Sequence, residues 1–226
     1  MSFIDILINF ILHVDRYLNF LITTFGLWTY VILFGIIFAE TGLVVAPFFP
    51  GDSLIFIAGS FAAAGSLDLW VLFVVFAFAA IIGDTVNYWI GHYLSRKAFH
   101  DKSRFFKKEY LVEAEKFYEK HGGKTIILAR FIPIIRTFAP FVAGVGKMTY
   151  SRFILYNIIG GIAWVSMFLF AGYLFGTIPI IKDNLSLVVI GIIVVSLVPA
   201  ALKVMGHLLK SKKLEKESDL LSGSKI

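Results

Sequence analysis

Long apolar stretches dominate this sequence and restrict the folds that it can adopt. Four of them, residues 21–42, 69–94, 152–176 and 185–206, have about the 20 apolar residues that a helix needs to cross a bilayer. The chain is 58% hydrophobic and 16% charged, whereas soluble domains average about 45–50% apolar and about 25% charged residues. These values exclude a soluble globule, a disordered chain and a nucleic-acid-binding domain. We therefore predict an all-α integral membrane protein with about four transmembrane helices.

The few charged residues are concentrated in two places. The loop 96–124 contains nine Lys/Arg and five Asp/Glu, and the tail from Lys203 contains six Lys and three acidic residues. Because Lys- and Arg-rich loops stay on the cytoplasmic side, both segments are expected there. We predict that the N-terminus and C-terminus both lie inside. Residues 1–20 are expected to form an amphipathic helix, and residues 207–226 a basic cytoplasmic tail.

Two further apolar stretches are unsuited to straight spans. Residues 43–66 and residues 125–146 each contain two prolines, and proline removes a helical hydrogen bond and kinks the helix. Re-entrant hairpins buried in protein are the usual alternative. A full crossing by 125–146 would leave the Lys-rich tail outside, so this hairpin is expected to insert from the cytoplasm. The first hairpin is then expected to insert from the outer face.

Each hairpin, with the span that follows it, forms a unit, and the two units resemble each other. Pro50 and Pro133 lie 83 residues apart, and Tyr93 and Tyr173 lie 80 residues apart. The two units are expected to have opposite directions in the membrane. This is the inverted repeat of secondary transporters, in which broken segments meet near the midplane and hold the substrate. We therefore predict one membrane transport domain over residues 21–206.

Charged side chains occur inside the apolar stretches, where each costs at least about 2.5–3.5 kcal/mol at the bilayer centre. Glu40 and Asp52 lie on or beside the first hairpin, and Arg130 and Arg136 lie on the second. If the hairpins meet, these four side chains can neutralise one another. The two arginines are also suited to binding a phosphate, and the two carboxylates to carrying a proton, since burial disfavours their charged form. A purely structural set of salt bridges is the competing interpretation.

A second polar group lies on one face of the span 69–94. Asp84, Tyr88 and His92 follow one another at intervals of four residues, so they share a helix face. We interpret them as a secondary polar seam between helices, with a proton relay through Asp84 as the alternative. Asn157 and Trp164 are expected to serve mainly in helix packing.

Enzyme motifs are missing from the sequence. It has no GxSxG, HExxH or P-loop motif, no cysteine, and five histidines without metal-ligand spacing. Lipid phosphatases need a proline where Phe131 stands, and a histidine at working distance after Ser151 and Arg152, which is also missing. We therefore predict no enzymatic activity, no cofactor and no metal.

Several motifs together resemble a known family. They are ETGLVVAPFFPGDSL, IIGDTVNYWIGHYL and YEKHGGKTIILARFIPIIRTFAPFVAGVGKM, and the resemblance to the DedA family of bacterial inner-membrane proteins covers residues 3–205. DedA proteins carry the VTT, or SNARE-associated, domain. The resemblance implies a bacterial cytoplasmic membrane location, envelope lipid transport and dependence on the proton motive force. It also implies that Glu40, Asp52, Arg130 and Arg136 are functional positions.

Residues and resemblance together predict a flippase for an anionic lipid head group. The expected substrate is undecaprenyl phosphate or a phospholipid, and protons and the membrane are the other expected partners. No nucleic acid is expected, and a homo-oligomer is left open. A proton-coupled transporter of small ions or solutes and a non-transporting scaffold are the two alternatives.

Overall fold

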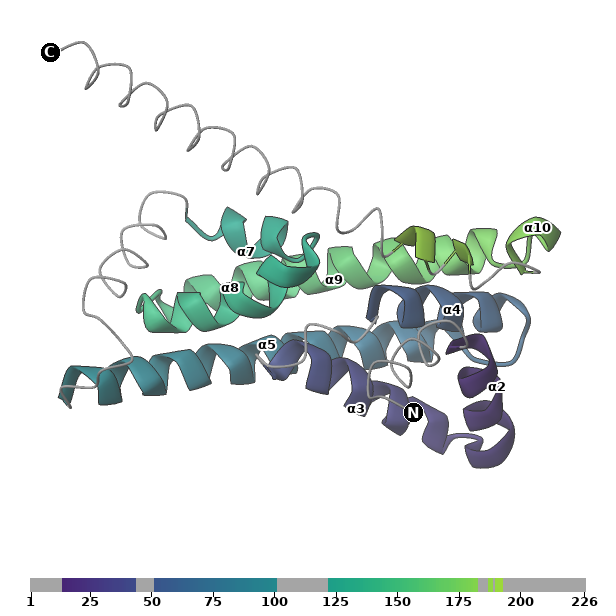
Figure 1. Ribbon diagram of the computed structural model, residues 1–226, viewed down its shortest axis with the longest axis horizontal. Helices are drawn as coiled ribbons and strands as arrows, with labels where there is room; N and C mark the ends of the chain where they lie inside the picture. The colour runs from purple at the N-terminus through teal and green to yellow at the C-terminus, as the bar shows by residue number, and fades with distance from the viewer. Residues whose placement is uncertain (1–13, 44–50, 101–121, 183–186, 189, 193–226) are drawn as a thin grey trace, which may run out of the picture.

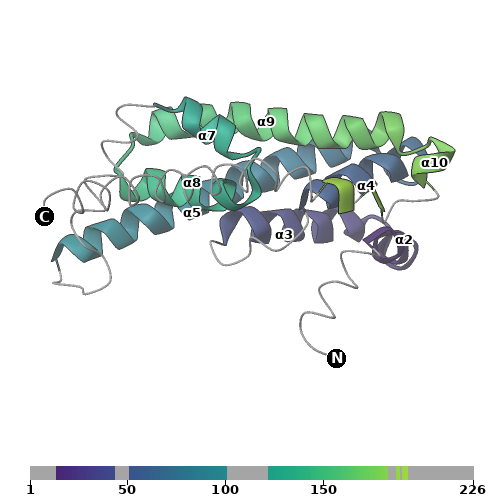
Figure 2. The same ribbon diagram turned by 45° about the horizontal axis from the view of Figure 1, so that its top comes forward.

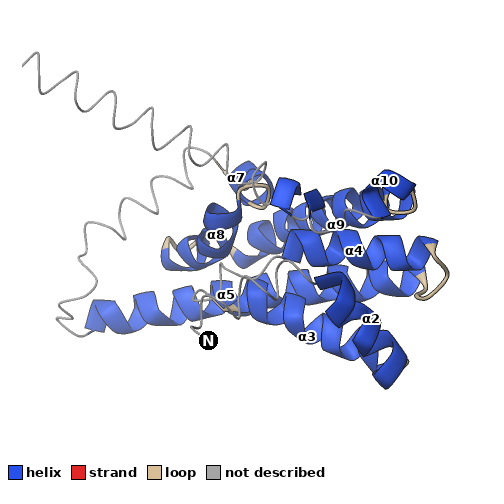
Figure 3. Ribbon diagram, turned by 45° about the vertical axis from the view of Figure 1, so that its right-hand side comes forward, coloured by secondary structure: helices blue, strands red, loops and turns tan. Residues whose placement is uncertain are grey.

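The structure, a computed structural model, describes residues 14–43, 51–100, 122–182, 187–188 and 190–192. Over these residues the chain is all-helical and contains no strand, as predicted (Figure 1 and Figure 3). Several predicted segments lie largely or wholly outside the described residues: the helix 1–20, most of the loop 96–124, the span 185–206 and the tail 207–226.

Two long helices form the centre of the fold. Helix α5 (Leu69–His100) and helix α9 (Tyr150–Phe175) lie side by side and run in opposite directions (Figure 1 and Figure 2). Both contain segments long and apolar enough to cross a membrane, Leu69–Ser95 in α5 and the whole of α9. They correspond closely to the predicted spans 69–94 and 152–176.

Exposed tryptophans mark the part of α5 that suits the hydrocarbon core. Trp70 and Trp89 are both exposed and lie 19 residues apart, which is about 28 Å along a helix. This length is close to the roughly 30 Å thickness of the hydrocarbon core, and tryptophan gathers at membrane interfaces. Asp84 lies between these two tryptophans, nearer to Trp89.

The predicted span 21–42 does not form one continuous helix. Helix α2 (Val14–Phe25) ends before Gly26, and helix α3 (Trp28–Gly42) begins two residues later. Gly26 has a φ of 53°, a left-handed conformation that glycine adopts without steric cost. The helix breaks there because of this backbone turn, which hydropathy does not detect. The 15 residues of α3 extend about 22 Å, well short of a full crossing.

The first pair of short helices is α3 and helix α4 (Gly51–Ala63). The backbone N–H of Gly51 donates to the Glu40 carboxylate at 3.3 Å, so the end of α3 lies beside the start of α4. Of the hairpin predicted at residues 43–66, the structure describes α4, which packs beside the end of α3, and residues 44–50 lie outside the described residues. Re-entry of this segment into the membrane stays a prediction.

The second pair falls where the sequence predicts a hairpin, at residues 125–146. Helix α7 (Lys124–Ala129) is followed after three residues by helix α8 (Pro133–Val145). Pro133 begins α8, at the position where a missing N–H costs nothing. Insertion of the two pairs from opposite faces of the membrane stays a prediction.

The returning helices α4 and α8 cross the long helices in the same way. Helix α4 packs on α9, and α8 packs on α5. At each crossing one glycine from each helix lies so near the other backbone that an added Cβ would be 1.8–2.2 Å from a carbonyl oxygen. The pairs of glycine and carbonyl residue are Gly144 with Tyr88 and Gly91 with Phe141, and Gly59 with Leu169 and Gly172 with Phe56.

This shared packing defines the register of the repeat. The offset between corresponding residues is 85 for α4 and α8 and 81 for α5 and α9. The sequence predicts 83 and 80, so the repeat is confirmed in the packing while its register is corrected by one or two residues. The error arises because apolar helices align well in several registers, whereas glycine contacts between backbones allow one.

Candidate functional site

Arg136, in the first turns of α8, is buried between two carboxylates from the first pair of helices. Its guanidinium forms ion pairs with Glu40 of α3 and Asp52 of α4. Glu40 is fully buried, and Asp52 and Arg136 are nearly so. The predicted meeting of acidic and basic residues from the two hairpins is therefore confirmed for Arg136.

Trp164 of α9 completes the surroundings of this arginine. Its indole N–H donates to Asp52 Oδ1 at 2.9 Å, and its ring centre lies 5.0 Å from Arg136 Cζ. A desolvated cation–π contact of this kind contributes up to about 2 kcal/mol. Trp164 therefore makes polar contacts in addition to the helix packing that the sequence predicts for it. The available signal was its position deep within α9, away from the interfaces where tryptophan gathers.

Arg130, immediately after α7, pairs with different residues than predicted. It forms an ion pair with Asp84 of α5 and also donates to Asn157 Oδ1 of α9. The Ala80 carbonyl accepts a weaker hydrogen bond from the same nitrogen at 3.4 Å. The expected pairing of Arg130 with acids of the first hairpin is therefore wrong, because α7 packs on α9 and places this side chain between the two long helices. Asp84 and Asn157 join the charged group instead of acting only in helix packing.

Glycines provide the space for these charged side chains. An added Cβ at Gly160 of α9 would lie 3.2 Å from Arg130 Cδ, and one at Gly51 of α4 would lie 1.7 Å from Glu40 Oε2. Larger side chains at these positions would therefore displace the arginine or the carboxylate. The sequence shows the glycines but does not show which charged groups they accommodate.

The predicted seam of Asp84, Tyr88 and His92 is divided in the structure. Asp84 lies in the ion pair with Arg130, whereas the Tyr88 hydroxyl donates to the carbonyl of Met148, in the connection from α8 to α9. His92 stacks on Tyr88 with ring centres 6.1 Å apart. Tyr88 and His92 thus belong to an aromatic group, together with Trp89, Tyr150 and Phe153.

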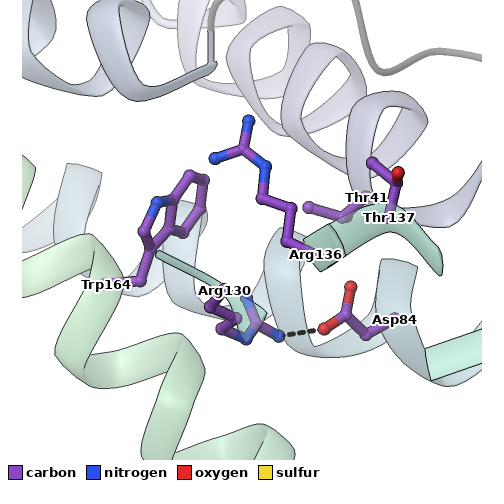
Figure 4. Close-up of a pocket in the computed structure, with 6 residues that line it drawn as sticks. All are labelled: Thr41, Asp84, Arg130, Arg136, Thr137 and Trp164. Carbon is purple, nitrogen blue, oxygen red and sulfur yellow. Dashed lines mark hydrogen bonds and ion pairs between the residues drawn. The ribbon is translucent and has the colours of Figure 1, made fainter. Parts of the chain in front are cut away.

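A small cavity lies between the two ion-paired arginines and is lined by Thr41, Asp84, Arg130, Arg136, Thr137 and Trp164 (Figure 4). The space open to the centre of a water molecule is about 10 Å³, which is room for about one water and too small for a phosphate group. Figure 4 shows the Arg130 guanidinium beside Asp84 and the Arg136 guanidinium beside Trp164. The arginines therefore share one space but are held apart by separate partners.

The five charged residues do not balance. Three carboxylates and two guanidiniums leave one negative charge in excess when all are ionised. Buried charges need neutralisation, because the protein interior screens them poorly. Glu40 Oε2 is buried and has no hydrogen-bond partner among the described residues, so it is an oxygen on which a proton can reside.

Comparisons with known proteins identify the family. The VTT domain family matches residues 49–174, which include four of the five charged residues. Protein DedA of Escherichia coli (strain K12) is 54% identical over 210 residues, covering 92% of this chain and 96% of that protein. This chain belongs to the DedA family. The resemblance seen in the sequence motifs is thereby confirmed.

More distant DedA-family relatives have names that agree with a membrane location. A membrane protein of Mycobacterium leprae, named uncharacterized, is 45% identical over 73% of this chain and 74% of its own length. Inner membrane protein YqjA of Escherichia coli (strain K12) is 32% identical over 67% of this chain and 69% of its own length. No solved structure matches the chain. The present DedA-family chain is therefore a membrane protein.

Proposed function

We propose that this DedA-family protein translocates the phosphate head group of an anionic lipid, with undecaprenyl phosphate as the leading substrate and a phospholipid as the second. The observation that carries the proposal is the cavity shared by Arg130 and Arg136. A guanidinium binds phosphate oxygens through two parallel hydrogen bonds. Two guanidiniums that line one cavity between apolar helices are suited to binding a phosphate that has left water.

A lipid suits the outer surface of the molecule as well as the cavity. The outer faces of α5 and α9 carry exposed apolar side chains, among them Val74, Phe78, Ile159 and Leu174. The acyl or prenyl chain of a substrate can therefore stay in the bilayer during transport. Only the head group needs a polar path, and the buried charged group supplies one.

The present arrangement corresponds to a closed site. The cavity holds about one water, and both arginines are occupied by carboxylates. A phosphate must therefore replace carboxylates as the partner of the arginines, and the site must widen. Protonation of Glu40 or Asp52 removes one of the two charged partners of Arg136 and also reduces the negative charge of the group. This exchange supplies a direct route for coupling transport to a proton gradient.

The packing repeat supports alternating access to this site. Helices α4 and α8 occupy corresponding positions on α9 and α5, and the charged group lies where the two halves meet. In a bacterial cytoplasmic membrane with both termini inside, the two pairs of short helices would then insert from opposite faces. Movement of one half against the other would expose the arginines to each side in turn.

The test is head-group translocation in proteoliposomes that contain the purified protein and either undecaprenyl phosphate or fluorescent phosphatidylglycerol. We expect Arg136→Ala and Arg130→Ala to reduce the rate to that of protein-free vesicles. Arg152→Ala, which removes an exposed arginine of α9, is the matched control and should leave the rate unchanged. Wild-type rates in folded Arg136→Ala and Arg130→Ala proteins would rule out the proposal.

The small size of the cavity favours one alternative, a proton-coupled transporter of a small ion. That function predicts flux of a water-soluble ion in vesicles without any anionic lipid.

The ion-paired state of both arginines in the group favours a second alternative, a scaffold in which the charges only join the helices. Exchanging the two charges, with Glu40→Arg and Arg136→Glu in one protein, distinguishes a scaffold from a phosphate-binding transporter. The exchange can restore a structural ion pair but not a phosphate site.

A further inference from the structure

The two arginines of the cavity are held unequally. Arg136 forms ion pairs with two carboxylates and lies against Trp164. Among the described residues, Asp84 is the one carboxylate paired with Arg130. The other oxygens that accept hydrogen bonds from Arg130, those of Ala80 and Asn157, are neutral. An incoming anion therefore needs to displace a single charged partner to reach Arg130, but two to reach Arg136.

The positions of these partners show from which side Arg130 is reached. Asp84 lines the cavity together with Arg130, whereas Asn157 and Ala80 are not among the lining residues. A ligand in the cavity thus approaches Arg130 on the side of Asp84. Asn157 is anchored independently, because its amide donates to the Ile81 carbonyl at 3.0 Å.

Arg130 can therefore exchange one anion for another with little movement. Asn157 and the Ala80 carbonyl hold the guanidinium in place while the carboxylate gives way to a phosphate. The exchange keeps Arg130 paired with an anion throughout, which matters because an unpaired charge in a buried site is costly. When the ligand leaves, the carboxylate returns and prevents immediate rebinding.

We propose that Asp84 competes with the lipid phosphate for Arg130 and thereby sets both the affinity of the site and the rate of release. This inference rests on the proposed function, because it assumes that the phosphate binds in the cavity. Asp84 acts through Arg130 and is a positioning residue. Its effect on affinity has the opposite sign to that of the arginines: removing its charge tightens binding.

The experiment measures binding of undecaprenyl phosphate, and separately of phosphatidylglycerol, to the full-length protein in nanodiscs. We expect Asp84→Asn to bind the phosphate lipid about tenfold more tightly, since a charge-assisted hydrogen bond no longer competes for Arg130. We expect the same variant to translocate the head group more slowly, because release is delayed. Asp84→Glu keeps the competing charge and should stay near wild type. A merely structural Asp84 predicts weaker or unchanged binding in Asp84→Asn.

A double-mutant comparison separates competition for Arg130 from a general change in charge. Asp84→Asn removes one negative charge from the group, which by itself favours an anion. In an Arg130→Ala background, the specific gain should disappear, because no guanidinium remains for the competition. A tenfold gain that persists without Arg130 would overturn the inference. Asn157→Ala should weaken binding instead, because Arg130 loses its fixed support.

The outcomes also separate this inference from the proposed function. If the wild type binds neither lipid and moves no head group, the proposed function is wrong. If the wild type binds through Arg130 but Asp84→Asn binds no more tightly, only the competition is wrong. Should Asp84→Asn fail to fold, Asp84→Ser provides the same loss of charge with a smaller side chain, and the same gain in affinity is required of it.

Discussion

The two halves of the molecule share a backbone arrangement but differ in their buried polar residues. Helices α4 and α8 approach α9 and α5 through equivalent glycine contacts. By the register of those contacts, Arg136 of α8 corresponds to Gly51 of α4, against which the Glu40 carboxylate lies. The guanidinium in one half is thus matched by open space for an acid in the other. Repetition of the packing places the halves together, and the differences between them supply complementary charges.

The largest expected effect comes from removing the positive charge of Arg136, which distinguishes the half that contains α8 from the half that contains α4. Arg136→Ala leaves two buried carboxylates without their guanidinium, and breaking a buried ion pair costs about 3–5 kcal/mol. We expect a large fall in the melting temperature of the purified protein in detergent. Arg136→Lys should recover part of the loss, because an ammonium keeps the charge but not the two-pronged geometry. An unchanged melting temperature for Arg136→Ala would contradict the arrangement described for Glu40 and Asp52.

A smaller effect is expected from the shared packing. Gly144→Ala and Gly59→Ala each introduce a Cβ at a crossing where 2.0–2.2 Å separates it from a carbonyl oxygen, and overpacking costs about 1–3 kcal/mol. Because the crossings correspond, the two variants should lower the melting temperature by similar amounts. Gly35→Ala is the control, since nothing lies within 4 Å of its added Cβ, and it should be neutral or stabilising. A strong effect in one crossing and none in the other would show that the halves are not equivalent.

Trp164 tests the surroundings of Arg136 without altering any charge. Trp164→Phe keeps an aromatic ring but removes the N–H that donates to Asp52. We expect a loss of about 1–3 kcal/mol, which is the cost of a hydrogen bond to a buried charged group, and a slower head-group translocation. Trp89→Phe removes the N–H of an exposed tryptophan on α5 and serves as the matched control. If Trp164→Phe and Trp89→Phe have the same stability and the same translocation rate, Trp164 has no role in the site.

Tyr88 is expected to show the smallest effect. Tyr88→Phe removes the hydroxyl that donates to the Met148 carbonyl, at a cost of about 1 kcal/mol. The aromatic group that contains Tyr88 and His92 is a packing element, so translocation should stay close to the wild-type rate. A loss of transport comparable to that of Arg130→Ala would indicate instead that Asp84, Tyr88 and His92 act together in transport.

Some features of the site follow from local sequence alone. Glu40, Asp52, Arg130 and Arg136 are charged residues within apolar segments, and their burial is predictable because the bilayer penalises charge wherever a segment lies inside it. The spans 69–94 and 152–176 are predictable for the same reason. The break at Gly26 is not, because its apolar neighbours mask a change that occurs only in the backbone dihedral angles.

The sequence by itself determined the class of the protein, its family and the four charged positions, because hydropathy and motif are properties of contiguous residues. The tertiary structure decided the partners. Arg130 meets Asp84 and Asn157, and Trp164 meets Asp52, across separations of 27 to 112 residues. Periodicity indicates which face of a helix is buried but not which side chain from another helix lies opposite. That choice depends on where glycines let the helix backbones approach, and only the packed fold defines it.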